Sequence, residues 1–174
     1  MKGRIVTIVI AMLVGVSFVR CAPNSDIIRN DMVINGLTLC NSYTQEQMIE
    51  ALGQPDSIIL YTNDSGAFRK YYYGIDYFRV TAEDDYFIDF KVTNSHFRFN
   101  NFISVGDPVA RVSLLGGIIQ DFEVVNYNGQ PVKFKNWQIS KDVNEDKYYS
   151  SSINFVYNNN GNIESISAVY NSLL

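Results

Sequence analysis

Side chains that could do chemistry are few in this chain and widely spaced. His96 is the only histidine, so a histidine-rich metal site is excluded and a Ser-His-Asp triad would depend on this one residue. Residues 83–85 are all acidic and could bind a cation or act as paired carboxylates, but contiguous acids between strands are more typical of a solvated turn. We therefore predict no catalytic residue, no metal site and no cofactor, and we class the protein as not an enzyme.

One segment resembles the start of a calcium-binding loop. Residues 142–146 follow the D-x-N-x-D pattern. However, Lys147 stands where such a loop requires Gly, and Ile153 stands where it requires the closing Glu. We expect an ordinary solvated loop here.

Aromatic and basic side chains are the stronger candidates, because Tyr and Arg bury much area on binding at low entropic cost. Side chains alternate between the two faces of a strand, so neighbouring strands would gather one set of them on one face. If helices cover only the other face, this set is exposed and binds another protein; the alternative is that it shields a wet sheet face and binds nothing. The predicted binding face consists of Arg69, Tyr71, Tyr73, Phe87, Lys91, His96 and Arg98.

The elements that must position this face follow a pattern that occurs twice. Residues 44–53 and residues 107–116 start 63 positions apart, and each has a helix-capping residue, a short amphipathic stretch and a Leu-Gly stop. Thr44 and Gln47 predict a capping box, and Asp107 is expected to cap the second helix ahead of Pro108. Each helix would be marginal alone in water, so both must pack on a sheet.

Antiparallel strands are expected after each helix. The predicted fold class is therefore α+β, with two tandem helix-plus-antiparallel-sheet repeats that form one compact domain and helices packed on one face of the sheet. The repeats span residues 33–100 and 101–174; Trp137 fits either the core or the exposed face. The expected strands are 33–34 with 37–39, 58–61, 68–73 (continuing to 80 with a bulge at Gly74), 86–93, 96–99, 122–126, 132–139, 149–157 and 163–170.

The first 20 residues are typical of an export signal. Lys2 and Arg4 precede an apolar run at residues 5–19, which is short for a membrane span. Residues 21–32 are expected to be a flexible lead-in. An exported protein with this signal is expected in the periplasm, the outer membrane or the cell surface of a Gram-negative bacterium.

The processing of this signal leaves alternatives open. Cys21 follows the apolar run, where a bacterial lipoprotein carries its lipidated cysteine, although Arg20 stands where a small residue is usual. Cleavage after Ser17 would instead permit a disulfide between Cys21 and Cys40 in an oxidising compartment. An uncleaved anchor is the third alternative. Membrane contact is expected only through such an N-terminal anchor.

The net charge excludes one class of partner. Residues 1–20 hold three of the 14 basic residues and none of the 18 acidic ones, which leaves a net charge of −7 for residues 21–174. Nucleic acid is an unsuitable partner for such a chain, because phosphate binding needs a basic surface.

The segment from Leu37 to Asp56 resembles the "L-x-x-G-x-T-x-x-x-V-x-x-x-L-G-x-P" opening of the SmpA/OmlA outer-membrane lipoproteins. Residues 103–117 are similar to the same opening, and a helix-plus-sheet unit used in tandem resembles β-lactamase-inhibitor-protein-like (BLIP-like) domains. Ser42 stands where the pattern has Gly, and the second copy lacks the Pro after Leu-Gly. The resemblance implies an exported, often lipid-anchored protein whose sheet binds another protein, and it implies no catalytic residues.

Three functions from different classes follow. The leading expectation is a non-enzymatic envelope protein that binds another protein through its aromatic sheet face, as an inhibitor or an assembly accessory. The alternative is a small-ligand or glycan binder that stacks its ligand on tyrosines, which predicts a deep pocket. The third is a hydrolase of unrecognised type, which would need His96 or the acidic turn to meet a nucleophile in a cleft.

Overall fold

The computed structural model describes residues 32–64, 66–126, 128–140 and 149–172. The expected export signal, Cys21, nearly all of the lead-in and the calcium-like loop lie outside the described residues. Within the described residues, no helix is both long enough and apolar enough to cross a membrane.

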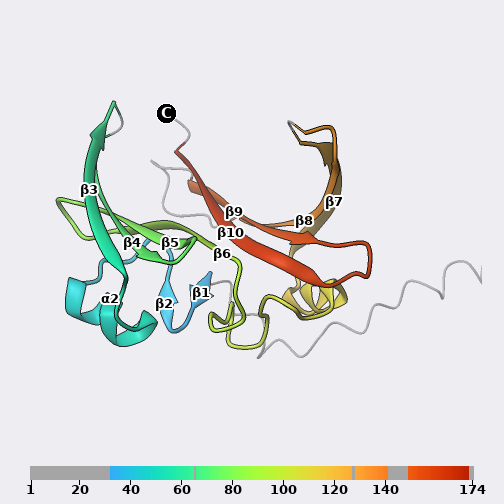
Figure 1. Ribbon diagram of the computed structural model, residues 1–174, viewed down its shortest axis with the longest axis horizontal. Helices are drawn as coiled ribbons and strands as arrows, with labels where there is room; N and C mark the ends of the chain where they lie inside the picture. The colour runs from blue at the N-terminus through green and yellow to red at the C-terminus, as the bar shows by residue number, and fades with distance from the viewer. Residues whose placement is uncertain (1–31, 65, 127, 141–148, 173–174) are drawn as a thin grey trace, which may run out of the picture.

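Eight strands form one antiparallel sheet in the order β3-β4-β5-β6-β10-β9-β8-β7 (Figure 1). The last strand in the chain therefore lies in the middle, between β6 and β9. Residues 57–92 supply one half of the sheet and residues 118–172 the other. The strands are β3 (Ser57–Asn63), β4 (Gly66–Tyr73), β5 (Asp76–Thr81), β6 (Phe87–Val92), β7 (Ile118–Val125), β8 (Pro131–Ser140), β9 (Tyr149–Tyr157) and β10 (Ile163–Ser172).

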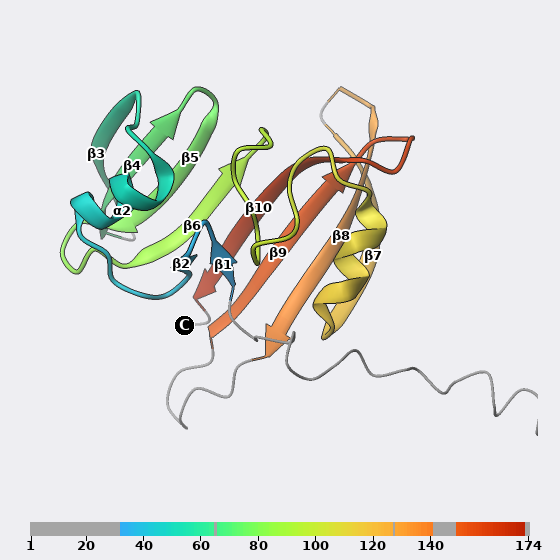
Figure 2. The ribbon, with the colours of Figure 1, turned by 90° about the horizontal axis from the view of Figure 1, so that it is seen from below.

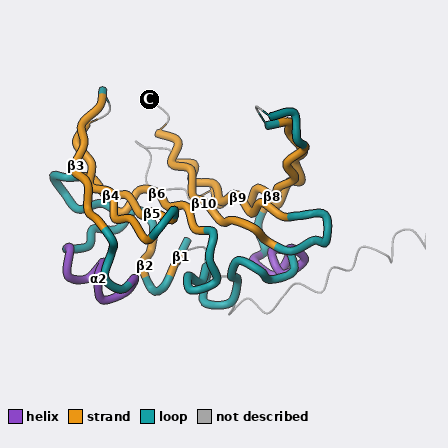
Figure 3. The backbone as a smooth tube through the Cα atoms, in the orientation of Figure 1, coloured by secondary structure: helices purple, strands orange, loops and turns teal. Residues whose placement is uncertain are grey.

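The predicted α+β class, with two tandem helix-plus-sheet repeats and helices packed on the sheet, is wrong. The described part of the chain is mostly β, with 53% strand, 12% helical residues and only two helices. These are the α-helix α2 (Gln45–Leu52) and the 3₁₀ helix η1 (Val109–Leu115). Figure 3 shows them at opposite ends of the same side of the sheet. Two such short helices cannot cover eight strands, so extended segments supply most of the cover.

The covering layer is largely a hairpin and a long loop. The hairpin pairs β1 (Val33–Ile34) with β2 (Leu37–Thr38), and residues 93–108 cross the sheet between the two helices (Figure 2). The predicted strand at 96–99 is wrong, because Phe99 makes only isolated bridges, to Ile34 and Ile103. The left-handed conformations of Asn100 and Asn101 turn the chain there. Phe97 and Phe99 point into the core from this loop.

The two capped segments differ in structure. α2 has the predicted capping box, in which the Thr44 hydroxyl accepts a bond from the Gln47 amide and the Gln47 side chain accepts one from the Thr44 amide. Asp107 does not cap η1, so that prediction is wrong. Its carboxylate instead accepts bonds from the Ser104 amide at 2.9 Å and from Arg111 Nη1 at 2.8 Å. The second segment therefore starts without a side-chain cap.

Both segments nevertheless contribute to one hydrophobic core on the covered side of the sheet. α2 buries Met48 and Leu52, and η1 buries Val112 and Leu115. Trp137, left open by the sequence, lies in this core, and its Nε1 donates a hydrogen bond to the Gly116 carbonyl at 2.7 Å. The largest fully buried side chains include Trp137, Tyr71, Phe78, Phe87, Phe90, Phe99 and Phe155.

Candidate binding face

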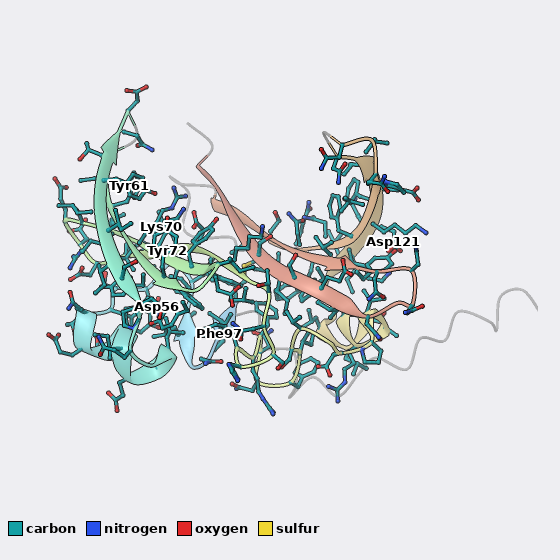
Figure 4. All side chains as sticks on the ribbon, viewed as in Figure 1. Asp56, Tyr61, Lys70, Tyr72, Phe97 and Asp121 are labelled. Atoms are coloured by element: carbon teal, nitrogen blue, oxygen red, sulfur yellow. The ribbon has the colours of Figure 1, made fainter. Side chains whose placement is uncertain are left out.

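The side of the sheet opposite the core is the candidate site, and we call it the open face. No described segment lies over it, and both ends of the sheet curve toward it (Figure 1). Figure 4 shows Tyr61, Lys70 and Tyr72 on this side, whereas Phe97 lies on the covered side. The register of strands β3 to β6 shows which other residues of the first half lie on the same side of the sheet. Its members there are Ile59, Tyr61, Phe68, Lys70, Tyr72, Tyr77, Arg79, Asp89 and Lys91.

The predicted binding residues on β4 lie on the core side instead. Tyr71 is fully buried, and Tyr73 packs edge-on against Phe78 and Phe97. Arg69 is half-buried at the margin of the core side and forms an ion pair with Asp85. The alternation was predicted correctly, but the wrong set of residues was assigned to solvent.

Phe87 is also fully buried, and a bulge explains why. β5 and β6 pair Arg79 with Asp89 but Val80 with Phe87, so Ile88 is an extra residue in the ladder. A bulge shifts the alternation by one position. Phe87 therefore shares the core side with Phe90, although simple alternation puts them on opposite faces.

The other three predicted residues lie on two different sides of the sheet. His96 and Arg98 are exposed but belong to the covering loop on the other side of the sheet. Lys91 is exposed on β6 and pairs in register with Tyr77 and with Ser167. Of the seven predicted residues, the structure places only Lys91 on the open face.

The most distinctive group on this face is a lysine that lies close to two tyrosine rings. Lys70 Nζ lies 3.8 Å from the centroid of the Tyr77 ring and 5.6 Å from that of Tyr72. The two rings tilt against each other with their centroids 6.4 Å apart. Burial is the main reason that the pKa of Tyr77 is raised. The Lys70 ammonium group therefore meets a neutral phenol, and the attraction is that of a cation for the face of an aromatic ring.

Arg79 lies next to this group and organises the adjoining residues. It forms an ion pair with Asp89, donates to the Tyr61 hydroxyl at 3.2 Å, and its guanidinium lies 5.1 Å from the centroid of the Phe68 ring. Burial raises the pKa of Asp89, and the charges of Arg79 and Lys70 oppose that effect. Burial alone would lower the pKa of Arg79, but its bonds to Tyr61 and Asp89 outweigh burial and raise it.

The open face of the second half has a different character. Phe122 stacks on Phe134 at 5.2 Å between centroids, and Asn136 donates to Asn154 at 2.7 Å. Among the residues of β7 to β10 that are paired in register, only neutral side chains lie on this face. Glu164 is the extra residue at a register shift in β10, and the charged pair of Asp121 and Lys135 lies on the other side. The open face thus joins a basic aromatic half to a neutral half.

Sequence reasoning missed Tyr61, Lys70, Tyr72, Tyr77 and Arg79 as members of this face. The signal that could have found them is in β5. There, Tyr77, Arg79 and Thr81 alternate with the buried Asp76, Phe78 and Val80. Arg79 indicates the solvent side of this strand, since charges are rarely buried unless they are paired. Asp76 is charged too but lies on the buried side, where its carboxylate accepts bonds from Thr93 and Asn94.

Within the described residues, no three His, Cys, Asp or Glu side chains lie close enough together to hold a metal ion. In comparisons with known proteins, no family model, no curated protein and no solved structure matches the chain.

Proposed function

We propose that this protein is an exported, non-enzymatic module that binds another protein through the open face. The observation that carries the proposal is the concentration of aromatic and basic side chains on a face that no described segment covers. Tyrosine and arginine are the residues that contribute most often to binding energy at protein interfaces. On this face they are already held in place, by the Lys70–Tyr77 contact and by the bonds of Arg79.

Prior ordering of these groups favours binding, because fewer rotamers are lost when the partner arrives. The neutral half adds the stacked pair of Phe122 and Phe134, of which Phe122 is exposed. An apolar patch beside a polar, charged one is a common composition for a protein interface. A nucleic acid remains an unsuitable partner, since residues 21–174 carry a net charge of −7.

The proposed location is the bacterial envelope, and it rests on the basic and apolar pattern of residues 1–19. Lipidation at Cys21 is the proposed form of any membrane contact. An inhibitor or an assembly accessory, the roles implied by the resemblance to BLIP-like and SmpA/OmlA-like proteins, is the proposed kind of activity.

Affinity capture from native envelope extract tests this proposal, with the full-length tagged chain as bait. We expect a protein partner that is retained by the wild-type chain and lost with Tyr72→Ala and with Lys70→Ala. The matched control is Glu50→Ala on α2, an exposed residue on the covered side, which should retain the partner. Equal capture by all variants would contradict a role for the open face. Absence of any partner, together with turnover of a substrate panel, would favour an enzyme instead.

A further inference from the structure

The sheet has two edge strands, β3 and β7, and neither has a strand on its outer side in the described part of the chain. An edge strand presents unpaired backbone donors and acceptors to which another strand can add. Proteins usually block such pairing with charges, Pro or bulges on the edge. The two edges differ sharply in this protection.

β7 carries two acids near its middle, Asp121 and Glu123. In a symmetric antiparallel pair of β7 strands centred on Phe122, Asp121 of each copy would face Glu123 of the other. Centring the pair on either acid would place two identical acids opposite each other. Like charges directly opposite across strands are destabilising, so these three registers, which pair the middle of β7 with itself, are disfavoured.

β3 has no such protection. Its sequence from Ser57 to Asn63 contains no charged residue and no Pro, and it ends in polar residues on both sides of an apolar centre. Ile59 is 49% exposed and Leu60 is 66% exposed, and they lie on opposite faces of the strand. Its outer edge therefore exposes apolar surface beside a backbone that has no strand partner on that side in the described part of the chain.

The order of residues in β3 is also self-complementary. In a symmetric antiparallel pair centred on Ile59, this residue meets its own copy, Ile58 meets Leu60 of the other copy, and Ser57 meets Tyr61. Asp56 then faces Thr62, so no like charges are opposed. Moving the centre to Leu60 would set Asp56 opposite Asp64, which disfavours that register.

We propose that the chain forms a symmetric dimer in which β3 pairs with β3 of a second copy, with the two-fold axis at Ile59. The axis is perpendicular to the sheet, so the two sheets continue each other and both open faces point the same way. A single pair of strands buries little area, which is typical of weak, reversible association. We therefore expect weak association, with a dissociation constant on the order of 10 μM. This inference does not depend on the proposed function.

Sedimentation equilibrium of the full chain tests the proposal over a concentration range that brackets this value. We expect the mean mass to rise from monomer toward dimer. Ile59→Lys sets two cations against each other at the axis and should weaken the dimer at least tenfold. The matched control is Val124→Lys, which places the same charge on the other edge at a residue of similar exposure, 47%; it should leave the dimer unchanged.

Circular dichroism shows whether Ile59→Lys still folds; if it does not, Leu60→Lys at the more exposed neighbour replaces it. The register is tested separately with Ile59→Cys. Directly opposed residues on antiparallel strands are close enough for a disulfide, so this variant should cross-link well above the wild-type background, and Val124→Cys should not. A monomer at every concentration, a dimer unaffected by the Lys variants of β3, or a dimer lost with Val124→Lys would overturn the proposal.

Discussion

The two halves of the sheet, β3–β6 and β7–β10, share a plan but differ in the details that surround it. Each has four antiparallel strands and one short helical segment that ends at Leu-Gly. The first segment is an α-helix with a complete cap, and the second is a 3₁₀ helix with no side-chain cap. Both nevertheless bury two apolar side chains in the same core. Burial of these side chains is therefore common to the two halves, and the helical hydrogen-bond pattern is not.

The largest expected effect concerns whether the two halves unfold as one cooperative unit. The Phe99 ring contacts Phe90 in the first half and both Trp137 and Phe155 in the second. Phe99→Ala should lower the free energy of unfolding by about 3–5 kcal/mol, the usual cost of removing a buried phenyl ring. Urea denaturation measures this cost.

Phe97→Ala supplies the contrast, because the Phe97 ring contacts rings only in the first half, Tyr73 and Phe78, among the described residues. Trp137 is the only tryptophan in the chain and reports on the second half by fluorescence. If the halves unfold together, Phe97→Ala shifts the fluorescence transition as far as the circular dichroism transition. A fluorescence midpoint that stays in place would show that the halves unfold separately.

A smaller effect is expected at two glycines, one from each half. Gly74 and Gly117 have similar left-handed conformations, with φ of +66° and +72°. A Cβ at Gly74 would meet open space, so Gly74→Ala should cost about 1–2 kcal/mol of backbone strain. A Cβ at Gly117 would lie 3.1 Å from Trp137 Nε1, so Gly117→Ala should cost about 1 kcal/mol more. Chemical denaturation compares them, and equal costs would mean that the indole moves aside freely.

The smallest effect is a dependence on alkaline pH that belongs to the first half. Burial raises the pKa of Tyr73 to about 12, whereas the unfolded chain has a value of about 10. A pKa raised on folding contributes stability below the unfolded value, and that contribution is lost as the pH rises from about 10 through about 12. Tyr73→Phe should therefore flatten the fall in unfolding free energy over this range. If the slope is unchanged, the fall in unfolding free energy comes from groups other than Tyr73.

Much of the strand layout could be predicted from the sequence, because it depends on local patterns. β9 spans the predicted residues 149–157, and the turns at residues 63–66 and 128–129 separate the strands that they were expected to separate. β5 was expected to continue β4 through a bulge at Gly74 but follows a turn there. The 3₁₀ geometry of η1 was missed, because the pattern of apolar residues does not report which carbonyl each amide bonds to.

The identity of the open face could not be predicted, because β4 has aromatic rings on both sides. Tyr71 and Tyr73 alternate with Phe68 and Tyr72, and either set could form a core. The choice is made by the covering loop, whose Phe97 and Phe99 come from distant positions in the chain and pack on one side. Such a choice depends on tertiary packing, which strand periodicity does not encode. The bulge at Ile88 is a second such effect.

The central position of β10 has a consequence for biosynthesis. Strands β3–β6 leave the ribosome before β10 has been made, and β6 finds its partner on that side only when the last strand arrives. Domains tend to fold as their residues emerge. The two halves of this sheet, however, cannot be joined until translation has passed residue 166, where β10 pairs with β6. Until then, β6 lacks its partner on that side, and a chaperone could bind its unpaired edge.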